Sequence, residues 1–157
     1  MATELTRAKR LRCARRAMGL TQQGLAALTG VQQSTIAAYE SGKRQPSDAA
    51  MHRLLSGMDA RPSKLLERRK DDLKALLRAH GVEHVWVFGS TARGDDELAS
   101  DIDLMIDLPD DASLFEIFRM QRDAAELLGL RIDIVERGAL NPKNSWHAKM
   151  LCEAVEL

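Results

Sequence analysis

The chain has 157 residues, of which 45% are hydrophobic, and 23 Lys and Arg residues balance 23 Asp and Glu residues. This hydrophobic content is ample for packed cores, but no run approaches the roughly 18 apolar residues that span a bilayer. The first residues lack the basic and then apolar layout of a signal peptide, so we expect a soluble, cytoplasmic protein. Cys13 and Cys152, one in each half, predict neither a disulfide framework nor a zinc site.

The neutral total hides two halves of opposite charge. Up to Lys64 the chain carries 11 Lys and Arg against 4 Asp and Glu, and from Leu65 onward it carries 12 against 19. A basic small domain indicates a polyanionic partner, because phosphates that it neutralises release counterions. The acidic half could hold a divalent cation or simply be a solvated surface. We therefore predict two domains, residues 1–65 and 66–157.

Short helices are predicted throughout the first half. Over residues 6–18 apolar residues recur three or four apart, and Lys and Arg occupy the remaining faces. Gly19 ends this helix, and Thr21 is a good N-cap for a second one. A third helix is expected over residues 33–40, a fourth after the loop SGKRQPS, and a last one from Pro62.

The stretch GLTQQGLAALTGVQQSTIAAYESGKRQPS resembles the helix-turn-helix region of the lambda repressor and Cro class, also called the Xre class. The LTQ, the LA pair, the Gly turn, the Ile of the third helix and the E-x-G-K/R-x-P ending stand at the expected spacing, within about the first 65 residues. The resemblance implies an all-α domain that binds operator DNA, usually as a two-fold dimer with recognition helices about 34 Å apart. The alternative is a helical domain whose polar face serves only protein contacts.

The resemblance assigns DNA contacts to seven residues: Gln22, Gln32, Gln33, Ser34, Ala37, Lys43 and Arg44. Gln22 would meet backbone phosphate at the start of the second helix. The recognition helix would present its glutamines to the major groove, where glutamine pairs bidentately with adenine. The two cations that follow it would contact phosphate, which positions the protein without specifying sequence.

No flexible Gly-Ser tract separates the two halves. Leu66, Leu73, Leu76 and Leu77 keep a helical spacing after Pro62. We therefore predict that a helix joins the domains and that the boundary lies near residues 61–66.

The second half is expected to contain three strands and a long helix. VWVF, at residues 85–88, is a β-branched and aromatic run that ends at a Gly-Ser pair, so a buried strand leads into a turn. Alternation over residues 101–107 and 130–136 predicts two further strands whose Ile and Leu residues share one face. Residues 113–129, between these two strands, have helical spacing.

Three aspartates lie opposite the apolar faces of these strands. Asp101 and Asp103 would be roughly 7 Å apart along one strand, and Asp133 is on another. Neighbouring carboxylates repel one another unless a cation lies between them. Magnesium fits, since it takes oxygen ligands from one or two carboxylates, water and substrate phosphates. The D-x-D pattern alone is equally consistent with an edge strand that has a solvated polar face.

The combination of G-S-x-x-x-G, then S-D-I-D-L, then a distant strand with one more Asp resembles the minimal nucleotidyltransferase family of the polymerase-beta superfamily. The similarity covers about residues 70–157, including the closing MLCEAVEL, which resembles the family's final helix. It implies a small mixed-sheet α/β nucleotidyltransferase domain. The whole chain is then an α+β two-domain protein, with the all-α helix-turn-helix domain first.

The resemblance implies six site residues: Gly89, Ser90, Arg93, Asp101, Asp103 and Asp133. The Gly-Ser pair would approach the β- and γ-phosphates of ATP, where glycine removes steric obstruction. The three aspartates would be catalytic and hold magnesium, two ions being expected, and Asp133 could also take a proton from the attacking hydroxyl. Arg93 would either steady the triphosphate or pair with Asp95 or Asp96.

Other side chains offer little chemistry. The four histidines lie in no ligand spacing, and each is most simply a surface or interface residue. Trp86 and Trp146 are better explained by packing than by base stacking.

A helix-turn-helix fused to a minimal nucleotidyltransferase resembles antitoxins of prokaryotic toxin–antitoxin operons. This resemblance implies magnesium-dependent transfer of AMP from ATP to a hydroxyl of a partner HEPN-like ribonuclease toxin, together with autorepression of the operon. One alternative is a non-enzymatic transcription repressor whose second domain binds nucleotide or a partner. Another is a small-molecule nucleotidyltransferase.

Overall fold

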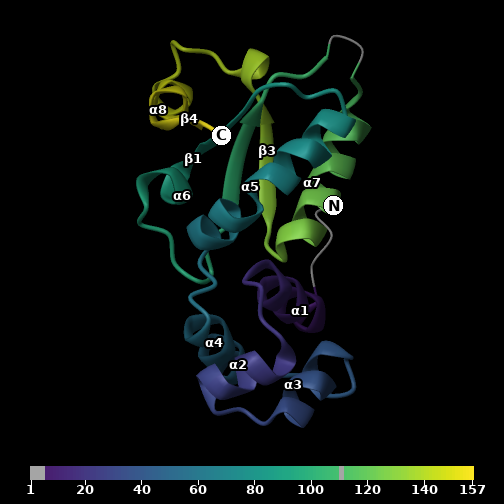
Figure 1. Cartoon of the computed structure of the whole chain (residues 1–157). Helices are drawn as coiled ribbons and strands as arrows, with labels where there is room; N and C mark the ends of the chain where they lie inside the picture. Colours follow the sequence, from purple (N-terminus) through teal and green to yellow (C-terminus); the bar gives the residue numbers. More distant parts are fainter. Residues whose placement is uncertain (1–5, 110–111) are drawn as a thin grey trace.

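The computed structural model describes residues 6–109 and 112–157. Figure 1 shows a helical region beneath a sheet that is flanked by further helices. This arrangement confirms the predicted fold class, an all-α region followed by a mixed-sheet α/β region. Among the described residues, no helix is both long and apolar enough to cross a membrane.

Four helices form the N-terminal region: α1 (Arg7–Ala17), α2 (Gln22–Thr29), α3 (Gln33–Glu40) and α4 (Asp48–Gly57). Side-chain oxygens of Thr6, Thr21 and Ser47 cap α1, α2 and α4 by accepting hydrogen bonds from backbone N–H groups in the first turn. The third helix has the bounds predicted for it, and it buries Ile36 and Tyr39. Local capping and apolar spacing therefore account for these helices.

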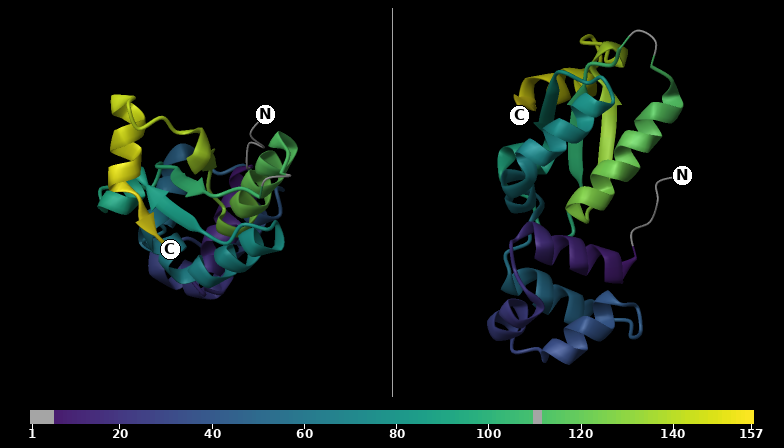
Figure 2. Two further views of the ribbon diagram at one scale, coloured as in Figure 1. Left: turned by 90° about the horizontal axis from the view of Figure 1, so that it is seen from above. Right: turned by 45° about the vertical axis from the view of Figure 1, so that its right-hand side comes forward.

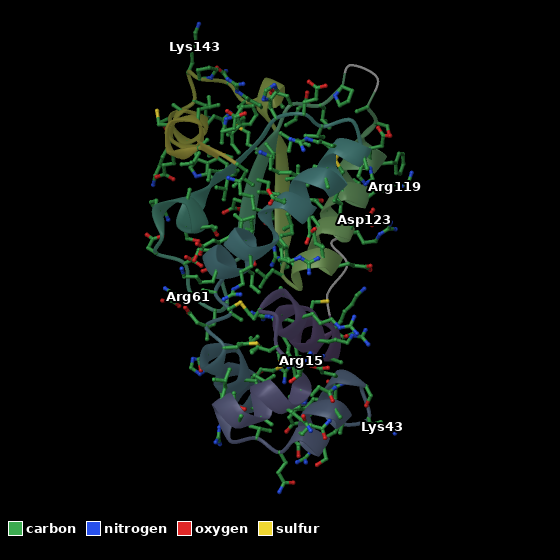
Figure 3. All side chains as sticks on the ribbon, in the orientation of Figure 1. Arg15, Lys43, Arg61, Arg119, Asp123 and Lys143 are labelled. Carbon is green, nitrogen blue, oxygen red and sulfur yellow. The ribbon has the colours of Figure 1, made fainter. Side chains whose placement is uncertain are left out.

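A buried ion pair connects α1 to the end of α3. The Arg15 guanidinium donates to both carboxylate oxygens of Glu40, at 2.6 and 2.9 Å, and the Gln22 amide donates to the same carboxylate at 3.0 Å. Burial by itself would raise the pKa of Glu40, but the hydrogen bonds from Arg15 and Gln22 and the Arg15 charge outweigh it and lower that pKa. The predicted recognition helix is thus tied to α1 by a charged, fully hydrogen-bonded contact (Figure 3 labels Arg15).

A helix crosses the predicted join between the two halves. Helix α5 (Pro62–Ala79) starts with its Pro in the first turn and has one break in helical geometry, at Arg69. It buries Leu65 and Leu66 before the break and Leu73 and Leu77 after it. The joining helix was expected, whereas the division at residue 65 stays a prediction.

The C-terminal region is a four-stranded mixed sheet with strand order β3-β2-β1-β4. Its strands are β1 (Val85–Phe88), β2 (Ile102–Ile106), β3 (Ile132–Glu136) and β4 (Val155–Glu156). Strand β1 pairs antiparallel with β2 and β4, and β2 pairs parallel with β3. The remaining elements are α6 (Gly89–Arg93), α7 (Leu114–Leu128), a 3-10 turn (Arg137–Ala139) and α8 (Ser145–Glu153).

Helices cover both faces of this sheet (Figure 2). Helices α5 and α7 pack on the face that carries Ile102, Leu104 and Ile106, which are fully buried. On the other face, Met150 of α8 packs against Phe88 and Met105. The face of β2 that carries Asp103 becomes apolar at Met105, where α8 lies over it.

The end of the chain differs from the expectation. The closing MLCEAVEL was expected to be helical, but α8 ends at Glu153 and the next residues form the edge strand β4. Backbone pairing of Val155 with Val87 and of Glu156 with Trp86 draws these residues to the sheet. A β-branched residue beside an open strand edge therefore overrides the helical pattern.

The N-terminal region is docked on the second region through α1. Lys9 forms an ion pair with Glu126 of α7 at 2.5 Å, and the Cys13 thiol donates to the Glu126 carbonyl at 3.2 Å. The contact is closest at Gly129, where an added Cβ would lie 2.6 Å from the Cβ of Cys13. The buried residues of both regions form one continuous hydrophobic cluster, so the two halves share a core.

Replacing Gly129 by Ala should destabilise the protein more than replacing Gly19 by Ala. Both glycines have positive φ, +73° and +70°, which costs an L-residue roughly 1 kcal/mol. Only at Gly129 would the new methyl group meet α1, and overpacking of this kind adds typically about 1–3 kcal/mol. Urea unfolding followed by circular dichroism measures both losses, and equal losses would contradict a tight contact between α1 and α7.

Candidate active site

The predicted aspartates meet at one edge of the sheet, where β1 ends and β2 and β3 begin. Asp103 is the register partner of Asp133 on the parallel strand β3 and of Phe88, the last residue of β1. Asp101 lies just before β2. The structure therefore brings together, at the end of VWVF, the carboxylates that the sequence places on separate segments.

Gly89 makes room for the carboxylate of Asp103. Gly89 has φ +70°, and a Cβ built on it would lie 2.5 Å from Oδ2 of Asp103. Glycine is needed here both for the left-handed backbone and for the close approach of the carboxylate. The sequence suggested that Gly89 lets phosphate approach the backbone. In the structure, Gly89 also leaves space for the carboxylate of Asp103.

The environment of Asp103 disfavours its charge. Burial, and then the charges of Asp133 and Asp101, raise the pKa of Asp103, while the charge of Arg93 opposes the rise. A cation placed among these carboxylates would relieve their repulsion. The arrangement is thus electrostatically suited to bind one.

Arg131 is a site residue that the sequence reasoning missed. Its guanidinium lies 3.5 Å from Asp101 Oδ2 and 3.7 Å from Asp133 Oδ2, so it bridges two of the three carboxylates. Arg131 and Asp133 are two apart at the start of β3, and the same period of two could have placed them together. Within residues 6–109 and 112–157, no three His, Cys, Asp or Glu side chains are gathered closely enough to hold a metal ion.

A pocket of about 380 Å³ opens beside Asp103 and Asp133. Gly89 lies in its lining next to these carboxylates, and Phe88, Val135 and Met150 supply apolar surface. Its volume falls within the range of about 300–1,000 Å³ that is typical of small-molecule sites. The pocket thus joins a charged end to an apolar end.

Arg93 and Ser90 lie on α6, directly after Gly89. Arg93 lines the pocket and pairs with Asp95 at 3.2 Å and with Glu153 of α8 at 2.9 Å. Asp96 does not take part, because it is buried and accepts a hydrogen bond from the Ser63 N–H at 2.8 Å. Ser90 is half-buried, and its carbonyl accepts from the backbone N–H of Gly94. Phosphate contacts by Arg93 and Ser90 stay predictions.

The interpretation of Trp146 as a packed side chain is wrong. Trp146 is 66% exposed and lines the same pocket, in the first turn of α8. Trp86, by contrast, is half-buried, stacked on His84 and covered by the Arg137 guanidinium 4.7 Å from its ring centre. The exposure of Trp146 depends on the position of α8 over the sheet, and no local sequence signal indicates that position.

The predicted DNA contacts lie around α3. Gln32, Gln33 and Ser34 are exposed at its N-terminal end, whereas Ala37, which was expected to be exposed, is half-buried on the next turn. Gln33 donates to the Gln22 side chain at 2.7 Å, and Gln22 donates in turn to Glu40. The glutamines of α2 and α3 are therefore held in one hydrogen-bonded row.

The two cations beyond α3 are both exposed. Lys43 projects outward from the loop after α3 (Figure 3), and the Arg44 guanidinium lies 5.7 Å from the ring centre of Tyr39. Cation–π contact with Tyr39 orients Arg44 along the same surface. Contacts with DNA at any of the seven residues remain predictions.

Fold and site together define a class of protein, a helix-turn-helix region joined to a small nucleotide-transferring α/β domain. The sequence profile described as "Nucleotidyltransferase domain" matches residues 64–153, and the profile described as "Helix-turn-helix" matches residues 11–65. The chain belongs to the nucleotidyltransferase domain family. The proposed resemblance to a helix-turn-helix fused to a minimal nucleotidyltransferase is thus confirmed, and the enzyme class it implies is that of a nucleotidyltransferase.

Known proteins with similar sequences and structures agree with this assignment. A solved structure of a minimal nucleotidyltransferase aligns with 34% identity and a TM-score of 0.54, over 60% of this chain and 95% of that one. The protein adenylyltransferase MntA of Thermococcus cleftensis is 32% identical over 45% of this chain and 79% of its own length. MJ0435 of Methanocaldococcus jannaschii, provisionally named for the same activity, is 31% identical over 43% of this chain and 72% of its own length.

Replacing Asp103 by Asn should stabilise the metal-free protein at pH 7. Because the folded-state pKa of Asp103 is raised, its favourable contribution to stability is complete below the unfolded pKa and is lost as pH rises through the folded pKa. The uncharged amide avoids that loss, so the gain should shrink as pH falls from 7 to about 4, near the pKa of an aspartate in an unfolded chain. Urea midpoints in EDTA at both pH values measure it, and a destabilised variant at pH 7 would argue against carboxylate repulsion. Asp123→Asn on α7 serves as the control.

Proposed function

We propose that the second domain transfers AMP from ATP to a hydroxyl group of a partner protein, and that the first domain binds operator DNA. The observation that carries the proposal is the in-register pair Asp103 and Asp133 beside Gly89, at the charged end of a nucleotide-sized pocket. Relatives named as protein adenylyltransferases support the AMP donor and the protein acceptor.

The residues present fit magnesium. Asp101, Asp103 and Asp133 offer only carboxylate oxygens. Burial, and then the charges of Asp133 and Asp101, raise the pKa of Asp103, and a bound divalent cation would offset the repulsive part of that rise. Asp103 and Asp133 would hold the ion or ions. Asp101 would join them by giving up its ion pair with Arg131 and binding the metal instead. When bound, magnesium neutralises charge on the triphosphate and polarises the α-phosphate.

The chain's own residues would do the remaining work. Asp133 accepts the proton of the attacking hydroxyl, whose oxygen forms a bond to the α-phosphorus as the bond to the leaving pyrophosphate breaks. The other phosphates would be held by backbone N–H groups at Gly89 and Ser90 and by the guanidinium of Arg93, since Gly89 and Arg93 line the pocket and Ser90 lies between them on α6. Catalysis then rests mainly on positioning and charge neutralisation.

The fused helix-turn-helix favours an antitoxin role. In this proposal, the acceptor is a HEPN-like ribonuclease toxin encoded beside this chain, and the basic α1–α4 region represses their shared operon as a homodimer. Such a repressor works in the cytoplasm of a prokaryote, where its DNA lies. The acidic surface of the second half does not compete for DNA, which separates the two tasks within one chain.

Transfer of AMP should depend on Asp133 and not on Asp123. Co-purified product of the neighbouring gene is incubated with magnesium and ATP labelled at the α-phosphate. Asp133→Asn should lower label incorporation on the order of 100-fold or more, because it removes both a metal ligand and the proton acceptor. Asp123→Asn removes a carboxylate of α7 that pairs with Arg122 and His80 and does not line the pocket (Figure 3 labels Asp123), so it should leave label incorporation unchanged.

Several results would redirect this proposal. Label on a small molecule in place of protein would favour a small-molecule nucleotidyltransferase. Magnesium-dependent ATP binding without any transfer would favour a repressor whose second domain only senses nucleotide.

Gln33 and Lys43 should affect DNA binding differently. Gln33→Ala should cost about 1–3 kcal/mol on specific DNA only, because it removes a base contact and frees Gln22 from its hydrogen bond. Lys43→Ala should weaken binding to all DNA, because it removes a phosphate contact. It should also lower, by about 1, the slope of the logarithm of the binding constant against the logarithm of salt concentration. Fluorescence anisotropy with the chain's own upstream region and with a random duplex measures both, and equal effects on the two probes would contradict the assignment of α3.

A further inference from the structure

Trp146 is exposed in the wall of the pocket at the candidate site. Two-thirds of the side chain is open to solvent, and the indole lines the pocket that also holds Asp103 and Asp133. An isolated exposed aromatic needs no explanation, but one in the wall of a concave site offers a planar apolar surface to a ligand. The other tryptophan, Trp86, already has packed neighbours on its ring.

The backbone of Trp146 is firmly held. The Asn144 side chain accepts hydrogen bonds from the N–H groups of Trp146 and His147 at 2.9 and 3.3 Å, and His147 Nδ1 accepts from Asn141 N–H at 3.0 Å. One turn later, Met150 anchors α8 on the sheet. The indole is therefore presented from a fixed helical turn, so a ligand does not have to order the backbone there.

One end of the pocket carries residues suited to bind phosphate, and the other end carries this indole. Arg93 of α6 pairs with Glu153 at the end of α8, close to Gly89 and the carboxylates. Trp146 is seven residues earlier on the same helix, about 10 Å along its axis. Val135 lies two residues beyond Asp133 on β3, so the strand also changes from charged to apolar in this pocket. A ligand that fits both ends is anionic at one end and planar at the other.

We propose that Trp146 stacks on the base of the donor nucleotide and sets a preference for purines over pyrimidines. This inference rests on the proposed function and assigns to that site its base-recognition residue. Stacking on an aromatic side chain is tolerant of base identity but grows with the size of the π-surface, which is larger for a purine. The carboxylates and Gly89 touch only the phosphate end, so they cannot supply this preference.

The test is calorimetric titration of the full chain with magnesium and ATP, GTP, UTP or inorganic triphosphate. Trp146→Ala should weaken ATP and GTP on the order of ten-fold or more, affect UTP less and leave inorganic triphosphate unchanged. Trp146→Phe should retain most of the affinity, because an aromatic ring remains. Trp86→Phe is the matched control and should bind as the parent does, and in it ATP should quench the remaining tryptophan fluorescence.

The outcomes separate this inference from the proposed function. If Trp146→Ala binds ATP and UTP as tightly as the parent, while Asp103→Ala loses both, stacking is wrong and the nucleotide site stands. An equal loss of ATP and inorganic triphosphate in a folded Trp146→Ala variant would likewise overturn stacking, since it would reflect displacement of α8. If the parent protein binds no nucleotide, both proposals fall.

Discussion

The close approach of Asp103 to Gly89 and Asp133 at one end of the sheet is the constraint on which the candidate site depends. Asp103 is held between Phe88 and Asp133 by strand register, and its carboxylate fits there only because Gly89 has no side chain. Apolar side chains on both faces of the sheet fix the strands, so the backbone positions of Asp103 and Asp133 are fixed as well. Burial, and then the charges of Asp133 and Asp101, raise the pKa of Asp103, so keeping this carboxylate ionised costs stability.

Local sequence signals were enough to predict most of the elements and the fold class. Helix α3 has the bounds that its apolar spacing and flanking turns predict, and the strand VWVF ends at Gly89 as expected. These features depend on residues close in the chain, such as the caps at Thr21 and Ser47. Alternation along a strand also assigns each of the three aspartates to a face, but only the resemblance to a family assigned them to a common site.

Long-range register could not be predicted in the same way. Gly89 lies beside Asp103 only because β1 pairs with β2. The last residues form strand β4 only because the other edge of β1 is open for pairing. The exposure of Trp146 depends on how α8 lies over the sheet, which its own sequence does not report. Arg131 is the one omission with a local signal, because it precedes Asp133 by two residues.

The docking of α1 brings the DNA-binding region within electrostatic reach of the carboxylates. Arg10 of α1 donates to the Leu98 carbonyl and lines a cavity of about 260 Å³ with Asp101 and Arg131. Burial lowers the pKa of the half-buried Arg10, and the charge of Asp101 opposes that shift, so Asp101 favours the charged form of a side chain that α1 contributes to the contact. The charge of Asp101 therefore adds to the packing of Cys13 against Gly129 where the two regions meet.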